Sequence, residues 1–163
     1  MRDTIIKAAR ELAKELHQGQ TDKAGKDYFA EHLCHVADMG RCPMEKIVGY
    51  LHDAAEDTFY SVEQVMQMLR ERCGDCLKDE HAQLISEALH ALNSKTAATR
   101  EEYINRVSEN ELAAEVKLND LRHNIEISRI ENPTEKDFER VERYKREFRK
   151  INEKQMLNHN KQN

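Results

Sequence analysis

The sequence contains few residues that break helices and few stretches that favour strands. Only five of its 163 residues are glycine and two are proline, and runs of valine, isoleucine and threonine are absent. Because tight turns and strands depend on these residue types, their scarcity favours helices. Hydrophobic residues still make up 39% of the chain and recur periodically, which excludes a disordered protein. The sequence therefore predicts an all-α protein.

Long apolar stretches are also missing. The longest uninterrupted run covers only a few residues, and the chain opens with an amphipathic pattern rather than an apolar signal core. We therefore expect a cytoplasmic protein with no membrane partner. The formal net charge is −5, and glutamates interleave with the basic residues of segment 139–150. This balance is typical of an ion-paired, solvated face and argues against a nucleic-acid partner.

The four cysteines do not form a recognisable zinc motif. Cys73 and Cys76 have the CxxC spacing, but no second CxxC or spaced histidine pair accompanies them, and only His81 offers a third ligand nearby. The pair is more typical of a helix end than of a structural zinc site. Without a signal peptide, all four thiols are expected to be reduced.

Apolar residues at three- and four-residue spacing predict about seven to eight helices in one compact bundle. The expected helices cover approximately 4–18, 29–39, 43–51, 61–72, 77–91, 99–107, 110–129 and 134–156. The residues between the first two, 19–28, lack the pattern and are expected to form a loop. One domain is expected over 1–157, followed by a polar, frayed tail over 158–163.

Three of the expected helices begin with recognisable signals. Pro43 suits the first turn of a helix, where its missing N–H costs nothing. Ser61 with Gln64, and Thr99 with Glu102, have the spacing of capping boxes. These signals place helix starts at 43, 61 and 99.

A histidine and an aspartate, His52 and Asp53, directly follow the apolar run 47–51 (IVGYL). Burial of both beside a core without partners would cost several kcal/mol, about the penalty for unpaired polar groups. A shared metal ion satisfies both, and this ligand type suits Mn, Fe, Co, Ni or Zn better than Ca. Glu56 and Asp57 follow one helical turn later, where carboxylates can exchange a proton with attacking water or a leaving group. An acidic, solvated helix end is the competing interpretation, which the helix dipole disfavours.

Two more candidate ligands lie elsewhere in the chain. Asp120 and Asn124 stand one turn apart on an otherwise apolar stripe that includes Val116 and Ile127, so Asp120 must be partly buried and needs a partner. A metal ion or a Lys or Arg side chain would serve, so a structural salt bridge competes with ligation. His32 precedes Val36 on another apolar stripe, where a satisfied core histidine is the competing interpretation.

Recognisable motifs occur in order along almost the whole chain. Residues 13–20 (AKELHQGQ) are similar to an A-x-x-x-H-x-G-Q opening, and the segment from Tyr28 to Ala37 to Y-x-x-H-P-x-x-V-A. Residues 51–58 (LHDAAEDT) match L-H-D-x-x-E-D-T, and 116–124 (VKLNDLRHN) match V-K-L-x-D-x-x-x-N. In these motifs the chain resembles the HD-domain superfamily of metal-dependent phosphohydrolases. More specifically, it resembles the hydrolase domain of RelA/SpoT-type (p)ppGpp enzymes and the stand-alone small alarmone hydrolases.

The resemblance implies a helical HD domain that hydrolyses a nucleotide in the stringent response, releasing pyrophosphate from the 3′ position of guanosine tetra- or pentaphosphate. The implied ligands, usually for Mn²⁺, are His32, His52, Asp53 and Asp120. The residues implied to position and activate the attacking water are Glu56 and Asp57. The resemblance also implies that Lys117 and Asn124 hold the substrate or the active-site helix. Lys23 is a candidate phosphate contact on the residues alone, and an ordinary solvated charge is the competing interpretation.

Several positions depart from the family pattern. Asp22 replaces an arginine that packs on guanine, and Ile127 stands where a threonine is common; the interval from Tyr28 to His32 is one residue longer, and Leu33 replaces a proline. These changes spare the ligand set and alter the nucleotide pocket. A phosphohydrolase acting on another nucleotide is therefore an alternative. A catalytically weak nucleotide-binding regulatory module is a third hypothesis, which retention of both carboxylates at 56 and 57 disfavours. A chain of this length is expected only to degrade.

Overall fold

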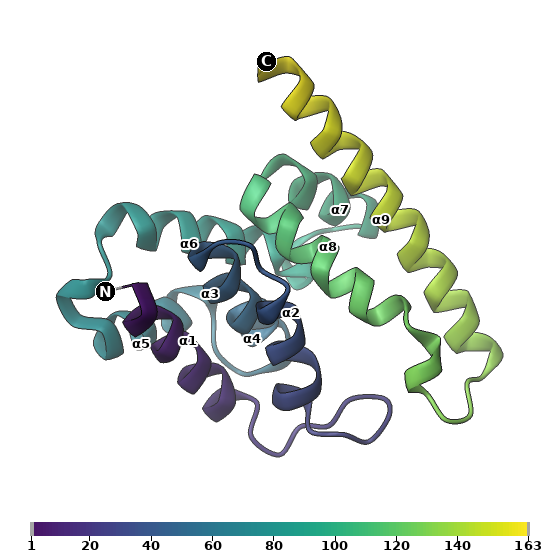
Figure 1. The fold of residues 1–163 in the computed structure, drawn as a ribbon, viewed down its shortest axis with the longest axis horizontal. Helices are drawn as coiled ribbons and strands as arrows, with labels where there is room; N and C mark the ends of the chain where they lie inside the picture. Colours follow the sequence, from purple (N-terminus) through teal and green to yellow (C-terminus); the bar gives the residue numbers. More distant parts are fainter. Residues whose placement is uncertain (1, 163) are drawn as a thin grey trace.

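Amphipathic periodicity produces helices over most of residues 2–162, the part of the chain that this computed structural model describes (Figure 1). The prediction of an all-α fold is confirmed, because these residues form no strand beyond an isolated bridge between Thr21 and Asp27. The α-helices are α1 (Arg2–Leu16), α2 (Cys34–Asp38), α3 (Pro43–Leu51), α4 (Ala54–Asp57), α5 (Val62–Cys73), α6 (Asp79–Leu92), α7 (Arg100–Glu109), α8 (Glu111–Ile125) and α9 (Glu135–Gln162). Within the same residues no helix combines the length and apolar character needed to cross a bilayer.

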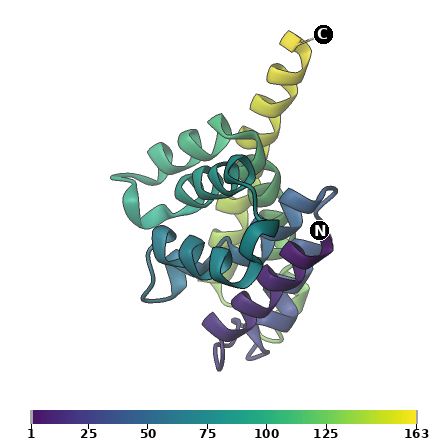
Figure 2. The same ribbon diagram turned by 90° about the vertical axis from the view of Figure 1, so that its left-hand side faces the viewer.

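Helix α3 lies at the centre of the core. It packs against α1, α2, α6 and α8, and Ile47, Val48 and Leu51 on it are almost fully buried. The turned view shows α5 between α1 and α6, against both of which it packs (Figure 2). Because α3 lies in the apolar centre of the bundle, the residues that follow its last turn, His52 and Asp53, also lie in the interior.

The helix expected over 29–39 is present but not regular. It begins as a π-helical turn, η1 (Phe29–Leu33), and continues as α2. A π turn takes one more residue than an α turn, so it accommodates a longer interval between Tyr28 and His32. Both ends of the interval therefore remain in contact, with the two rings 5.0 Å apart.

The predicted helix starts are reproduced with one modification. Pro43 occupies the first turn of α3, and Ser61 and Gln64 form a complete capping box at α5. At α7 the Thr99 side chain accepts from the Glu102 N–H, but the Glu102 carboxylate accepts from Ala98 instead of closing the box. Residues 19–28 form the expected loop.

Two helix ends were predicted wrongly. Helix α8 stops at Ile125 and a 3₁₀ turn, η4 (Ile127–Arg129), follows, so Ile127 does not share the face of Asp120. Helix α9 runs to Gln162, so residues 158–162 of the expected tail are helical, while Asn163 lies outside the described residues. The buried Gln155 amide donates to the Ser108 carbonyl, which holds this end of α9 against the end of α7.

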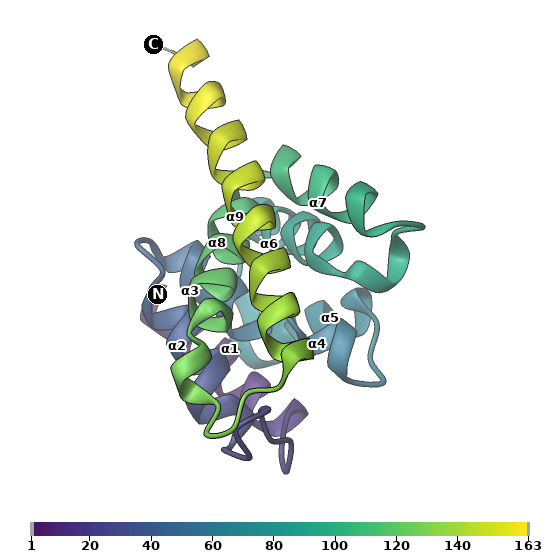
Figure 3. The same ribbon diagram turned by 90° about the vertical axis from the view of Figure 1, so that its right-hand side faces the viewer.

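The long helix α9 completes one side of the bundle. It runs along α8 and extends past it at its C-terminal end (Figures 1 and 3). Its first turns pack against η4. Because α8 carries Asp120, the start of α9 also borders the site described below.

Gly49 on α3 is needed for the close approach of α2. A Cβ atom at this position would lie 2.8 Å from the Ala37 Cα. We expect Gly49→Ala to lower the free energy of unfolding by about 1–3 kcal/mol, the usual cost of overpacking. Urea denaturation measures the change. Helix propensity alone would raise stability by about 1 kcal/mol, so a gain would contradict the close-packing argument.

Candidate metal centre

His52 and Asp53 directly follow the last residue of α3. Their side-chain polar atoms meet at one point in the interior of the bundle. The His52 Nδ1 is 2.8 Å from the Gly49 carbonyl oxygen. Because a carbonyl can only accept, Nδ1 carries the proton, and Nε2 faces the interior. This Nε2 is 3.0 Å from Asp53 Oδ2 but buried without a well-formed hydrogen bond to any described residue. Such an orphaned buried nitrogen is the feature expected of a metal ligand.

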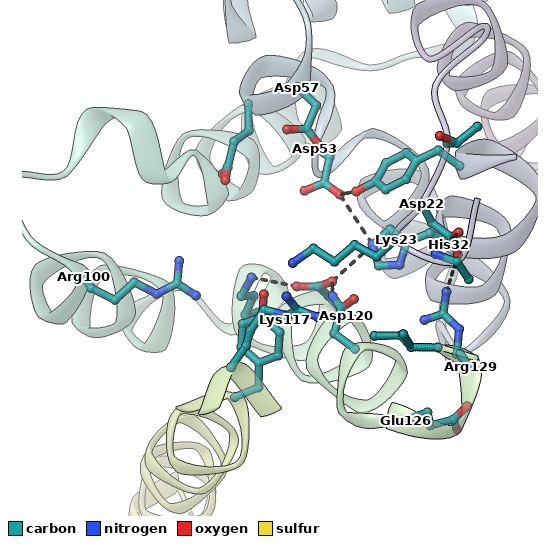
Figure 4. Close-up of a pocket in the computed structure, with 18 residues that line it drawn as sticks. Asp22, Lys23, His32, Asp53, Asp57, Arg100, Lys117, Asp120, Glu126 and Arg129 are labelled. Carbon is teal, nitrogen blue, oxygen red and sulfur yellow. Dashed lines mark hydrogen bonds and ion pairs between the residues drawn. The ribbon is translucent and has the colours of Figure 1, made fainter. Parts of the chain in front are cut away.

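His32 and Asp120 reach the same point from other elements. His32 projects from the π turn, with its Nε2 3.2 Å from Asp120 Oδ1 and 3.5 Å from Asp53 Oδ2. The donor atoms of His32, His52 and Asp53 all lie within 4.8 Å of one another, and Asp120 Oδ1 is 3.8 Å from His52 Nε2. The structure therefore brings the four predicted ligands together from η1, α3 and α8 (Figure 4).

Asp120 is held by two residues one turn away on α8. Lys117 Nζ is 2.7 Å from Asp120 Oδ2, and the Asn124 amide donates to Asp120 Oδ1 at 2.6 Å. The salt bridge considered as the alternative is therefore present, on the oxygen that faces away from the histidines. Lys117 and Asn124, expected to hold the substrate or the active-site helix, both border the pocket and both bond Asp120.

The charges at this point compensate one another strongly. Burial raises the pKa of Asp53, but His52 and His32 outweigh it and hold the pKa well below its usual value. Burial likewise raises the pKa of Asp120, and Lys117 with the two histidines reverses the effect. Burial lowers the pKa of His52, yet the carboxylates of Asp53 and Asp120 raise it well above normal. The two carboxylates are thus stabilised by positive charge beside them. Protons on the imidazoles or a divalent cation between the side chains would each supply that charge.

The residues present fit a divalent transition-metal ion. Two imidazole nitrogens and two carboxylate oxygens, all buried or nearly so, form a mixed N/O donor set of the kind that suits Mn, Fe, Co, Ni or Zn. Calcium prefers an all-oxygen set. The ligand roles of His32, His52, Asp53 and Asp120 remain predictions, and the geometry is compatible with all four.

Glu56 and Asp57 follow in α4 and border the same pocket. One oxygen of Glu56 accepts a hydrogen bond from the Ser94 N–H at 3.1 Å, which orients the carboxylate. This bond does not use the other oxygen of Glu56. Partial burial and the charges of Asp53 and Glu56 raise the pKa of Asp57 to about 6, although the residue is partly open to solvent. Both carboxylates are thus placed beside the ligand cluster, as the sequence predicted.

Tyr28 is a site residue for which sequence reasoning assigned no role. Its hydroxyl donates to Asp53 Oδ2 at 2.5 Å, and its ring lies between those of His17 and His32. Burial and the charge of Asp53 raise the pKa of the phenol, so it stays a donor. The motif containing Tyr28 was visible in the sequence, but its contact with Asp53, 25 residues away, was not.

The ligand cluster opens into a polar cavity of about 510 Å³. Lys23 points into it from the loop, and no carboxylate of the described residues lies within 4.0 Å of its ammonium group. Figure 4 shows Arg100 and Arg129 on opposite sides of the cavity. Sequence reasoning assigned no site role to these arginines or to Arg140 of α9. Arg100 and Arg129 lay in predicted helices, and the segment around Arg140 was interpreted as an ion-paired, solvated face.

The three lining arginines are all paired with carboxylates. Arg100 makes a two-pronged contact with Glu147 at 2.8 Å, Arg140 bonds Asp137 at 2.6 Å, and Arg129 bonds Asp22 at 2.7 Å. The segment around Arg140 is ion-paired as predicted, but the Arg140 side chain is only 17% exposed and faces the cavity.

The cysteines are not among the residues gathered at the candidate metal centre. All four are free thiols, and no group of three metal-binding side chains within residues 2–162 includes Cys73 or Cys76. Cys73 ends α5 and Cys76 ends a 3₁₀ turn, η2 (Gly74–Cys76). The helix-end interpretation therefore agrees with their positions.

Comparison with known proteins gives one partial similarity. No protein-family model matches the chain. Over 63 residues the chain is 35% identical to a GTP pyrophosphokinase of Streptomyces coelicolor, an alignment that takes in 37% of this chain and 7% of that protein. The chain thus corresponds to a small part of the length of this relative. What it shares with a GTP pyrophosphokinase is one segment.

Proposed function

We propose that this protein is a metal-dependent phosphohydrolase that acts on a nucleotide. The observation that carries the proposal is the convergence of two imidazoles and two carboxylates, from three separate elements, at one buried point beside a cavity. A divalent ion held there would supply Lewis-acid charge to a phosphate and make water more acidic.

The residues around the ligands have separate tasks in this proposal. Glu56 offers an oxygen that can accept a proton from the attacking water, while its other oxygen is held by Ser94. Asp57 assists, with a pKa of about 6 that lies close to neutral pH. Tyr28, Lys117 and Asn124 hold the ligand carboxylates in place.

The first candidate substrate is guanosine 3′,5′-bis(diphosphate), with release of its 3′ pyrophosphate. The cavity places Lys23, which has no carboxylate of the described residues within 4.0 Å, beside the candidate ligands, and its other lining residues include the ion-paired Arg100 and Arg140. These cations suit a ligand that carries more than one phosphate group. The partial similarity to a GTP pyrophosphokinase supports a guanosine nucleotide and a pyrophosphoryl group. The sequence motifs favour hydrolysis over synthesis.

A second candidate is another phosphorylated nucleotide. Asp22, at the position where an arginine would pack on guanine, is ion-paired to Arg129 and almost fully buried as a side chain. It therefore offers nothing to a base. This observation favours a phosphohydrolase whose base preference differs from that of the family it resembles.

A substrate panel with purified, Mn²⁺-loaded protein tests the proposal. We expect pyrophosphate release from guanosine 3′,5′-bis(diphosphate), measured by chromatography of the products, and loss of that release after chelation. Turnover should return when Mn²⁺ is restored.

The panel also contains a 3′-phosphonucleotide and the common NTPs and dNTPs. Turnover of one of these instead would establish the second candidate. Metal binding without turnover of any nucleotide would contradict the enzymatic proposal and leave the regulatory module, which nucleotide binding by calorimetry would then detect.

A further inference from the structure

His123 is a buried histidine that makes no contact with the cavity but touches a predicted ligand. Its Nδ1 is 2.8 Å from the Nδ1 of His32, on the side of that ring opposite the ligand cluster. Its ring stacks on His35 with centroids 4.3 Å apart. An imidazole in this place occupies the position that a carboxylate or carbonyl often fills behind a metal-bound histidine.

Arg129 determines which way the hydrogen bond between the two histidines runs. Its Nη1 lies 3.0 Å from the same Nδ1 of His123 and 3.2 Å from the His123 carbonyl oxygen. A guanidinium can only donate, so the His123 Nδ1 must be an acceptor without a proton. The proton shared at 2.8 Å must then belong to His32 Nδ1, because two lone pairs at that distance would repel. Consequently the lone pair of neutral His32 lies on Nε2, which faces Asp53 and Asp120.

Asp22 holds Arg129 in this orientation. One oxygen of Asp22 accepts from the N–H groups of Ala24 and Lys26, and the other accepts from Arg129 Nη2 at 2.7 Å. With both oxygens engaged, the Asp22 side chain is only 7% exposed. The loop that carries Lys23 is thereby joined through Arg129 and His123 to His32.

We propose that Asp22, Arg129 and His123 form a positioning chain that sets the tautomer of His32 for metal binding. The inference rests on the proposed function, because it takes His32 to be a ligand. In this proposal Asp22 does not contact a base. Its carboxylate orients Arg129, which acts through His123 on the side of His32 that faces away from the proposed metal ion. The positioning chain consists of three side chains in series, and each has a single compatible donor or acceptor role.

Mn²⁺ affinity of the full-length protein provides the first test, measured by the loss of the free-ion signal in electron paramagnetic resonance. We expect His123→Ala to weaken binding by about 10–100-fold, the usual effect of removing an outer partner of a ligand. His123→Asn keeps an acceptor near the position of Nδ1 and should stay close to wild type. Arg129→Met should weaken binding by about 10-fold and Asp22→Asn by less, because Asp22 is one step further from His32 in the positioning chain.

Arg72→Met is the matched control for Arg129→Met. Arg72 is 31% exposed as a side chain and pairs with Glu15 at 2.7 Å, against 25% and 2.7 Å for Arg129 and Asp22, but it lies on α5 away from the ligands. Unfolding of the metal-free variants in urea corrects for any loss of fold. Equal Mn²⁺ affinity in wild type and Arg129→Met, with equal stability, would overturn the proposal.

The tautomer itself can be observed without metal. Long-range proton–nitrogen correlations of the histidine rings, in metal-free protein at mildly alkaline pH, report which nitrogen is protonated. We expect His32 to carry its proton on Nδ1 in wild type and to show a mixture in Arg129→Met. A proton on Nε2 in wild type would refute the positioning chain even if the protein hydrolyses nucleotides. The expected tautomer in a protein that turns over no nucleotide would instead count against the proposed function alone.

Discussion

Replacement of Asp53 by alanine is expected to abolish metal binding and, with it, nucleotide hydrolysis. Asp53 Oδ2 is the oxygen nearest to His52 Nε2, at 3.0 Å, and it also faces His32 Nε2 at 3.5 Å. Loss of this carboxylate removes one of the four proposed ligands and one of the two proposed carboxylate ligands, which carry the negative charge that attracts a cation. We therefore expect Mn²⁺ affinity to fall by more than about 100-fold, beyond the range for an outer partner.

Calorimetric titration with Mn²⁺ and thermal unfolding both report this loss. At an ion concentration 100 times the dissociation constant, the wild type should gain about 2.7 kcal/mol of stability, and Asp53→Ala should gain almost none. Asp53→Asn keeps an oxygen for the Tyr28 hydroxyl, so it separates loss of charge from loss of that hydrogen bond. Asp75→Ala, at an exposed position in η2, is the control. Wild-type affinity in Asp53→Ala would remove the basis of the proposed metal centre.

Glu56→Gln is expected to keep the metal and lose turnover. A glutamine oxygen can still accept from the Ser94 N–H, so the local structure should persist. It cannot accept a proton from water, and kcat should fall by about 10²–10⁴-fold, the usual contribution of a general base. Steady-state kinetics with saturating Mn²⁺ measure the fall, and the titration used for Asp53→Ala measures metal affinity.

The two variants together separate ligand from base. We expect Asp53→Ala to lose both readouts and Glu56→Gln to lose only kcat. Equal loss of Mn²⁺ in both would show that Glu56 is itself a ligand, and unchanged kcat in Glu56→Gln would move the proton acceptor elsewhere, with Asp57 the next carboxylate along α4. Glu87→Gln, on the exposed side of α6, should change neither.

The residue types that form the candidate centre could be selected from the sequence because each stands out locally. His52 and Asp53 follow an apolar run, and Asp120 interrupts an apolar stripe. Burial of a polar group without a partner is costly, so such positions signal a partner before its identity is known. The ligand role of His32 came from the family resemblance instead. In the structure His32, Asp53, Asp120 and the pair Glu56 and Asp57 line one cavity, and His52 lies against His32 and Asp53; the roles of all six remain predictions.

Contacts between distant segments could not be predicted in this way. Arg100, Arg129 and Arg140 have ordinary helix or turn surroundings in the sequence, and only packing turns them toward the cavity. Asp22 was interpreted as a change in the nucleotide pocket, whereas its partner is Arg129, 107 residues away. A charge has no preferred partner in sequence, because its partner is whichever opposite charge the fold brings near.

The amino-acid sequence alone determined that this protein is helical, where most of its helices begin, and which histidines and carboxylates need a partner. These features depend on side-chain periodicity, capping and burial, which act over a few residues. Only the tertiary structure decided that His32 sits on a π turn, that α9 borders the cavity, and that His123 and Arg129 stand behind His32. Those features depend on which surfaces meet, and that is settled by packing of the whole chain rather than by any one segment.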